Sequence, residues 1–547
     1  MIHDGKIWVA NDANGNRMTI LPQMANRHGL VTGATGSGKT VTLKVMAESF
    51  SDMGVPVFMA DVKGDIAGLL KPGADSEDMQ DRISRFGLAD TDFNFHGYPV
   101  NFWDIYGEKG IQLRTTISEM GPLLMSRILN LNELQSNIMT IMFKIADDND
   151  LLLVDTKDLK AMLNYVSENN KTFAAQYGKM SPNSISAIMR SLVALEVEGG
   201  ETFFGETALN IHDWLALGEG GRGMINILDS ESLINNGRLY STFLLWLLSE
   251  LFEQLPEVGD LDKPKMVFFF DEAHLLFKDA PKPLLDKIEQ VVKLVRSKGV
   301  GVYFCTQNPR DIPDGVLAQL GNKIQHALHA YTPSDQKAVR AAADSFRTNP
   351  EFNTYDTIMN LGTAEAVISF LDEDGIPGIA QLVKILPPQS LIGTISDAER
   401  EMTIKSSLLY GKYYEAVDPD SAYEFLIRKG LEDAAERERL AAEEKAAKEK
   451  AAEEARAQKE AEKQAAAEAK AKAAEEAKAQ REAEKAEQAK KNAYKRSAKA
   501  VSSTVAGTVG REVGKTVGSS FGSFGKLLGG NLGASLGRGI IGTLFKN

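Results

Sequence analysis

The first 425 residues alternate short, continuously apolar runs with longer amphipathic segments. The apolar runs are 29–33, 55–61, 223–229, 265–271, 300–306, 323–330 and 364–371. Amphipathic segments such as Leu285–Arg296 and Ser334–Ala343 lie between several of them. Apolar runs of this length are typical of strands buried on both faces. Their alternation with helices predicts an α/β fold with a mostly parallel sheet covered by helices.

The interval from Gly64 to Glu219 breaks this rhythm. It holds stretches with helical periodicity, among them MGPLLMSRILNLNELQSNIMTIMFKIA and SPNSISAIMRSLVALE. Apolar residues spaced three and four apart are the signature of an amphipathic helix. We therefore expect an α/β core formed by 1–63 and 220–425, interrupted by a mainly helical insertion at 64–219.

A low-complexity segment follows at 431–494. It consists almost wholly of Ala, Glu, Lys, Gln and Arg and contains neither Gly nor Pro. Such residues favour a helix, and Glu/Lys pairs three and four apart support one. Large apolar residues are missing from heptad a and d positions, which disfavours a leucine zipper. The segment is either a long solvated spacer helix, with at best a weak Ala-seamed coiled coil, or a charged linker.

The last segment, 496–547, carries a stripe of glycines. They stand at positions 510, 514, 518, 522, 525, 529, 533 and 537, a spacing that places them on one helical face. Such a stripe predicts a helix that packs closely on a partner helix or lies at a membrane surface. The alternative is a flexible Gly/Ser-rich tail, because glycine disfavours helix.

Charge is distributed unevenly along the chain. The net charge is −13, but 496–547 holds seven basic residues and one acidic residue, so the remainder carries −19. The basic tail favours anionic lipid, whereas the acidic body argues against a broad basic nucleic-acid face. A small basic loop inside the pore of a ring is still compatible with this balance.

Features of localisation point to the cytoplasm. Met1–Val9 lacks the pattern of a signal peptide, and no run of about 18 apolar residues is present. The single cysteine, Cys305, lies in an apolar run, where we expect a reduced, buried thiol. The tail adds the expectation of a peripheral position at the inner face of the membrane.

A phosphate-binding loop is encoded near the start of the chain. GATGSGKT, residues 33–40, matches G-x-x-x-x-G-K-[ST] between a strand-like run and a helical segment. The expected phosphate-binding residues are Gly33, Ala34, Thr35, Gly36, Ser37, Gly38, Lys39, Thr40 and Val41. Small residues let backbone N–H groups surround phosphate oxygens. Lys39 is expected to reach the β- and γ-phosphates of ATP, and Thr40 to hold Mg²⁺.

Two acids end the apolar run VFFFDEAH, residues 267–274. A buried strand of this kind delivers carboxylates to the carboxyl end of a sheet. Asp271 is expected to bind Mg²⁺ and Glu272 to polarise a water, which favours hydrolysis over transfer to a small molecule. The alternative is an ordinary strand followed by an acidic helix cap. His274 either packs at the strand end or has a coupling role.

Gln307 follows the next apolar run, in YFCTQNPRDIPD, residues 303–314. It could contact the γ-phosphate and report its presence, or it could cap the following turn. The seven histidines and one cysteine show no metal-ligand spacing.

Together these motifs resemble the HerA/FtsK superfamily of P-loop ATPases, and more closely its uncharacterised YjgR-type HerA-like members. The resemblance covers roughly residues 1–425. It includes ADVKGDIAGLL at 60–70, similar to the family's D-x-K-G-[DE], and LGTAEAVISFL at 361–371, similar to its closing strand.

The resemblance implies a RecA-like core in a homo-oligomer, commonly a hexameric ring, that pumps DNA or sometimes protein at the expense of ATP. It places the Gln307 strand between the phosphate-loop strand and the Asp271 strand. Relatives often carry Asn-x-Arg-Ile at a strand that supplies a trans arginine finger. Here the matching place reads GNKIQ, with Lys323 where Arg is expected. Arg310 and Arg340 are the substitutes.

Three functions are compatible with these features. The first is an ATP-hydrolysing motor that translocates a polymer, DNA before others, through a ring. The second is an ATP-dependent switch or scaffold, tethered to a membrane or to partner helices by its tail. The third, a small-molecule kinase, is disfavoured by Glu272 and the large insertion.

Overall fold

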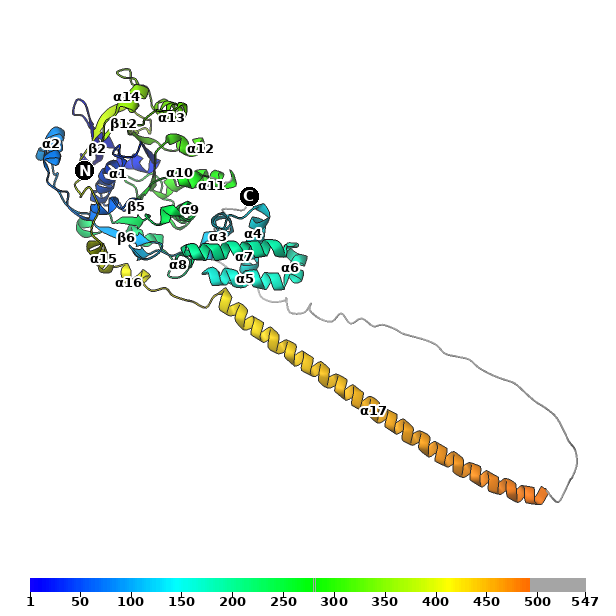
Figure 1. The fold of residues 1–547 in the computed structure, drawn as a ribbon. Coiled ribbons are helices and arrows are strands. Elements are labelled where there is room, and N and C mark those ends of the chain that lie inside the picture. The colour runs from blue at the N-terminus through cyan, green and yellow to red at the C-terminus, as the bar shows by residue number, and fades with distance from the viewer. Residues whose placement is uncertain (279, 281, 492–547) are drawn as a thin grey trace. The chain divides into compact units, whose positions relative to one another are not determined.

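In the part of the chain that the structure describes, a sheet of 13 strands forms the centre of the fold (Figure 1). The structure, a computed structural model, describes residues 1–278, 280 and 282–491. The spatial order is β1-β2-β13-β12-β11-β4-β10-β9-β5-β8-β6-β7, and β3 pairs with β2. The strands are β1 Ile2–His3, β2 Lys6–Asp12, β3 Arg17–Ile20, β4 Gly29–Thr32, β5 Val57–Asp61, β6 Val100–Asp104, β7 Ile111–Gln112, β8 Ile225–Asp229, β9 Met266–Phe270, β10 Val300–Thr306, β11 Asn322–Gln325, β12 Glu365–Ser369 and β13 Gln381–Ile385.

The strands from β11 to β7 run parallel. Successive residues of a strand point to opposite faces, and in β9 both sets are buried. Phe268 and Phe270 belong to one hydrophobic core, and Val267 and Phe269 to the other. This two-sided burial explains why the strands read as unbroken apolar runs. Each of the seven runs identified in the sequence contains a strand, so the predicted α/β sheet is confirmed.

An antiparallel extension was not expected from the sequence. β12 pairs antiparallel with β11, β13 with β12, and β2 with β13. The amino-terminal segment therefore joins the sheet next to a strand more than 360 residues later in the chain. The antiparallel strands leave only a weak pattern in the sequence. β13 alternates exposed and buried residues, and β1 is only two residues long.

Helices cover both faces of the sheet (Figure 1). Buried residues of α1 pack in the same core as Val267, whereas those of α9 and α11 pack in the core of Phe268. The helices are α1 Lys39–Asp52, α2 Glu77–Phe86, α3 Ile117–Ile128, α4 Glu133–Asp148, α5 Thr156–Glu168, α6 Asn170–Tyr177, α7 Pro182–Leu195, α8 Glu201–Phe203, α9 Gly237–Gln254, α10 His274–Phe277, α11 Lys282–Val295, α12 Asp314–Leu317, α13 Pro333–Asp344, α14 Thr354–Asn360, α15 Asp397–Ser406, α16 Tyr410–Tyr413 and α17 Ala422–Lys491.

The range 64–219 is less uniform than its periodicity predicts. Helices α3 to α8 all lie within it, between β7 and β8. It also contains β6 and β7, and β6 pairs with β8 as part of the parallel sheet. β6 does not read as an apolar run in the sequence, because it contains two polar residues, Asn101 and Asp104, both of which are buried.

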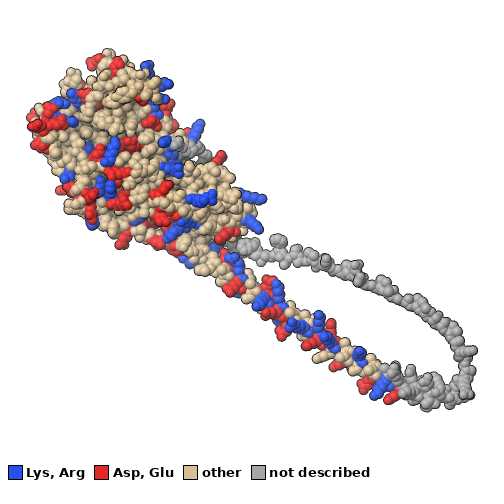
Figure 2. Space-filling model, viewed as in Figure 1, with Lys and Arg blue, Asp and Glu red and all other residues tan. Residues whose placement is uncertain are grey.

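Residues 431–491 of the expected spacer belong to one continuous helix, α17, rather than to a structureless linker. Its start is fixed by Asp158 of α5, whose Oδ1 accepts hydrogen bonds from Ser421 Oγ at 2.6 Å and Tyr423 N at 2.7 Å. The chain divides into two units after Ile427. Beyond that point, basic and acidic side chains are interspersed along the coloured part of α17 (Figure 2).

The glycine-striped segment expected at 496–547 lies outside the described residues. Among the residues that are described, none of the helices combines the length and the apolar character that crossing a bilayer requires.

Candidate functional site

The GATGSGKT loop connects buried β4 to α1. Gly33 has φ 154° and Gly38 has φ 110°, conformations that disfavour a side chain. A Cβ on Gly33 would lie 2.5 Å from the Cβ of His326, and one on Gly38 would lie 3.0 Å from the backbone of Ala364. Glycine is therefore required here by close packing as well as by φ. Thr35 and Gly36, at the tip, are exposed.

Lys39 is the first residue of α1. Its ammonium donates hydrogen bonds to two carbonyl oxygens of its own loop, Gly33 O at 2.6 Å and Ala34 O at 3.0 Å. Ser37 Oγ donates to Ala34 O at 2.7 Å. Thr40 and Val41 follow in the first helical turn, where both are half-buried. The first N–H groups of a helix have no hydrogen-bond partner within that helix. The Lys39 ammonium and these N–H donors therefore lie together at the amino end of α1.

His326 forms the floor beneath this loop and was not identified from the sequence. One ring nitrogen lies 2.8 Å from Thr42 Oγ1, and the other lies 2.9 Å from Glu365 O. Burial lowers the pKa of His326 to about 4. The ring is therefore neutral at pH 7, and it links α1 to β12. A polar residue inside the apolar run KIQHALHA was the available signal.

The acidic pair stands at the end of β9. Asp271 Oδ1 accepts a hydrogen bond from the Glu272 main-chain N–H at 2.9 Å, and Tyr240 OH donates to Asp271 O at 2.8 Å. Burial, together with the neighbouring Glu272 charge, raises the pKa of Asp271. Cys305 is buried, as the sequence predicts, and lies beside Asp271, so that burial raises its thiol pKa well above the ordinary value.

Glu272 is contacted from two sides. His274 Nδ1 lies 3.3 Å from Glu272 Oε2, and Gln307 Nε2 donates to Glu272 Oε1 at 3.4 Å. The close approach of His274 is the largest cause that lowers the pKa of Glu272, and the charge of Lys39 acts in the same direction. The carboxylate is therefore ionised at neutral pH.

Strand order explains why these residues meet. β10, which precedes Gln307, lies between β4 and β9, as the family resemblance implies. The strands are parallel, so their carboxyl ends share one edge of the sheet. Lys39, Gln307 and the Asp271–Glu272 pair thus come together, although more than 230 residues separate Lys39 from each of the others.

A fourth loop reaches this edge from β5. The buried Asp61 carboxylate accepts hydrogen bonds from Gly64 N at 2.8 Å and Ala67 N at 3.1 Å, and burial raises its pKa to about 7. These bonds fix the turn that carries Lys63, which is exposed. The positive charge of Lys63 opposes the rise in the pKa of Asp271, so the motif ADVKGDIAGLL lies close to the acidic pair.

The three candidates for a trans-acting cation differ in their surroundings. Lys323 Nζ donates to Ser345 O at 2.9 Å, and burial lowers the pKa of Lys323. Arg340 is exposed on α13, with its guanidinium 5.7 Å from the ring centre of Tyr355. Arg310 is exposed in the turn that follows Gln307. Lys323 is thus engaged within its own chain, whereas both arginines face solvent.

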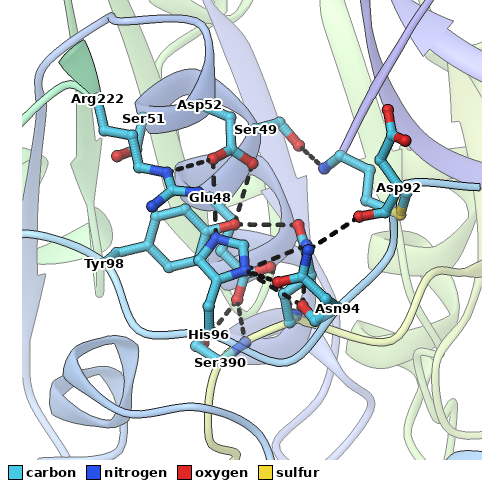
Figure 3. A network of polar contacts seen from close by, with 12 residues as sticks. Glu48, Ser49, Ser51, Asp52, Asp92, Asn94, His96, Tyr98, Arg222 and Ser390 are labelled. Atoms are coloured by element: carbon cyan, nitrogen blue, oxygen red, sulfur yellow. Dashed lines mark hydrogen bonds and ion pairs between the residues drawn. The ribbon is translucent and has the colours of Figure 1, made fainter. Parts of the chain in front are cut away.

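The second half of α1 is held by a separate polar network (Figure 3). Glu48, 1% exposed, accepts hydrogen bonds from Gln389 N at 2.9 Å, Ser390 N at 3.0 Å and Ser390 Oγ at 2.6 Å. Burial raises the pKa of Glu48, and these hydrogen bonds oppose that rise.

Asp52 extends the network one helical turn further. It accepts from Arg222 Nε at 2.9 Å and from Tyr98 OH at 3.0 Å (Figure 3). Three distant parts of the chain therefore meet on α1, which fixes the helix that carries the phosphate loop.

A comparison with protein families now places the chain. The model described as "Helicase HerA-like C-terminal" matches residues 6–528. The chain belongs to this HerA-like family. The DNA double-strand break repair helicase HerA of Sulfolobus acidocaldarius is 22% identical to it over 390 residues, which cover 69% of this HerA-like chain and 68% of that relative.

Two further similarities are more limited. A probable helicase of Methanocaldococcus jannaschii is 28% identical over 146 residues, and the HerA-like chain spans only 26% of that relative's length. Among solved structures, the plasmid coupling protein TrwB in complex with a non-hydrolysable ATP analogue is 15% identical. The match covers 69% of this chain and 89% of TrwB, with a TM-score of 0.47.

Proposed function

We propose that this HerA-like protein hydrolyses ATP and uses the free energy to translocate a polymer, DNA in the first instance, through an oligomeric ring. The observation that carries the proposal is the convergence at one sheet edge of Lys39, Gln307 and the Asp271–Glu272 pair. A phosphate-binding cation, two carboxylates and an amide donor are the groups that phosphoryl transfer to water requires.

Phosphate binding falls to the loop 33–41. Lys39 exchanges the carbonyls of Gly33 and Ala34 for β- and γ-phosphate oxygens, to which an ammonium bonds more strongly because they are charged. The N–H groups of the loop and of the first turn of α1 complete the cradle. Ser37 keeps the loop closed through its bond to Ala34.

A magnesium ion fits Thr40 and Asp271. Mg²⁺ keeps several waters and takes one or two protein oxygens besides phosphate, so one hydroxyl and one carboxylate are a sufficient donor set. Among the described residues, no group of three or more His, Cys, Asp or Glu side chains gathers as a metal site, so the proposed ion relies on phosphate oxygens for the rest. When bound, it neutralises charge on the β- and γ-phosphates.

Glu272 serves as the base in this proposal. A water oxygen bonds to the γ-phosphorus, the bond from that phosphorus to the bridging oxygen breaks, and Glu272 accepts the water proton. The lowered pKa of Glu272 keeps its carboxylate ready to accept. Gln307, whose amide already reaches Glu272, contacts the terminal phosphate and reports its presence.

DNA and the ring are supported by different observations. DNA is supported by two relatives, the DNA double-strand break repair helicases HerA of Sulfolobus acidocaldarius and Sulfurisphaera tokodaii. Arg310 and Arg340 are exposed, so a neighbouring copy could receive either as a trans finger, and the family resemblance suggests six copies. We place the motor in the cytoplasm, with the segment 496–547 as its proposed contact to a membrane or to partner helices.

The test is the steady-state rate of ATP hydrolysis with and without duplex DNA, in wild type and in Glu272→Gln. We expect severalfold stimulation by DNA in wild type. The Glu272→Gln variant should lose at least about 100-fold in rate while it still binds ATP. A Glu272→Gln variant that hydrolyses ATP normally would refute the hydrolytic role. A rate that depends on Glu272 but ignores DNA would refute the DNA motor in favour of a switch or scaffold.

A further inference from the structure

The contacts on Glu272 are long and therefore separable. Hydrogen bonds to a carboxylate are commonly 2.7–2.9 Å. Here the two contacts measure 3.3 Å to His274 and 3.4 Å to Gln307. The carboxylate is mostly buried, with 14% of the Glu272 side chain exposed, whereas 35% of the His274 side chain is exposed. A buried group with two weak contacts keeps its place only while both neighbours stay.

The backbone around this carboxylate is fixed more firmly. Glu272 has φ 48°, a left-handed conformation that is strained for a residue with a Cβ. Ala273 N donates to Cys305 O at 2.9 Å, which ties the turn to β10, and Leu275 N donates to Glu272 O at 3.0 Å. Strain of this kind persists only where the surrounding structure imposes it, and it marks functional sites. The main chain is thus rigid and the carboxylate is adjustable.

We propose that His274 is a positioning residue that sets the place of the Glu272 carboxylate, in opposition to Gln307. The two side chains lie against different oxygens of the same carboxylate and come from different strand ends. When Gln307 turns to the terminal phosphate of ATP, it releases Oε1, and His274 then alone determines where the base lies. This inference rests on the proposed role of Glu272 in ATP hydrolysis.

The alternative for His274 is packing at the strand end. Its partial exposure and its polar contact distinguish it from Leu276 and Phe277, the neighbouring residues of α10 that enter the core. A packing residue would be replaced by a side chain of similar volume without regard to its N–H donor. A positioning residue requires that donor.

The experiment compares His274→Ala with His274→Asn, whose amide keeps an N–H donor close to the position of Nδ1. His212→Ala, an exposed histidine in the segment Ile211–Leu215, is the matched control. For His274→Ala we expect kcat for ATP hydrolysis to fall about 10- to 100-fold, because the base is misplaced. The Kd for a fluorescent ATP analogue should stay within about twofold, because His274 contacts Glu272, which is not part of the loop 33–41. His274→Asn should regain most of kcat.

A double substitution adds an independent readout. If His274 and Gln307 act on one carboxylate, the losses in His274→Ala and Gln307→Ala will not multiply in the double variant. A wild-type kcat in His274→Ala, or equal losses in His274→Ala and His274→Asn, would overturn the assignment while the inactivity of Glu272→Gln left the proposed function intact. Activity of Glu272→Gln would remove both.

Discussion

Helix α1 connects two polar sites of opposite construction. At its amino end, the Lys39 ammonium bonds to carbonyls of its own loop, beside exposed residues and glycines with positive φ. In its second half, the Glu48 carboxylate accepts three hydrogen bonds from a segment some 340 residues away. The first site is local and exchangeable, whereas the second is remote and saturated.

The difference teaches how polar groups divide between function and stability. Bonds within a loop can be traded for bonds to a ligand without loss of tertiary contacts. The hydrogen bonds of Glu48 to Ser390 cannot be exchanged for bonds to a ligand. Their loss would leave a buried donor without a partner, which lowers the free energy of unfolding. Substitutions at the two ends of α1 should therefore separate binding from stability.

The largest effect is expected for Lys39→Ala. The rate of ATP hydrolysis should fall by about 10³-fold or more, because the substitution removes the cation that we propose contacts the β- and γ-phosphates. The thermal midpoint should change little, because the Lys39 ammonium donates its hydrogen bonds to carbonyls of its own loop. Lys179→Ala, an exposed lysine of the insertion, is the control for the loss of one positive charge. Unfolding of Lys39→Ala at a clearly lower temperature would erase the contrast between the two ends.

Glu48→Ala should behave in the reverse manner. It leaves the N–H groups of Gln389 and Ser390 buried without an acceptor, which should lower the free energy of unfolding by about 3 kcal/mol. Denaturant unfolding measures this loss. Glu48→Gln retains an acceptor oxygen and should lose less. At a temperature where both variants are folded, we expect ATP affinity close to wild type, and a large loss of affinity would contradict the separation.

An effect that appears only as the pH is lowered distinguishes His326 from Glu48. The pKa of His326 is lowered from 6.5 to about 4, so the unfolded chain binds more protons in this interval and the free energy of unfolding falls as pH falls. The full loss between pH 6.5 and 4 is about 3 kcal/mol. The raised pKa of Glu48 acts in the opposite direction, because protonation favours its folded form.

The contribution of His326 is isolated by comparison with His326→Asn. We expect the stability of this variant to fall less steeply with acid than that of wild type. Equal slopes of unfolding free energy against pH in the two proteins would show that the ring is not held neutral beneath the phosphate loop.

The parallel part of the fold could be predicted because burial on both faces leaves a strong local signal. β9 and β10 read as unbroken apolar runs that end in Asp271 and Gln307, so both the strands and their functional ends are visible in the sequence. The hairpin of β2 and β3 and the strand β6 mix polar with apolar residues. Their place depends on pairing with distant strands, which no local pattern encodes.

The site was predictable in composition and not in its contacts. The phosphate loop and the carboxylates follow from spacing, whereas the approach of His274 and Gln307 to Glu272 depends on φ at Glu272 and on the register of β9 with β10. The place of His326 beneath the phosphate loop could not be predicted, because a histidine in an apolar run has many structural uses. Its contact to Thr42 joins residues 284 positions apart.

The 70 residues of α17 have a consequence for how the size of the protein is measured. At 1.5 Å per residue the helix is a rod about 105 Å long. A rod of this length diffuses through a porous matrix like a far heavier sphere. Elution volume would therefore overstate the number of subunits. Light scattering or sedimentation equilibrium, which report mass independently of shape, would give the number of copies in the proposed oligomer.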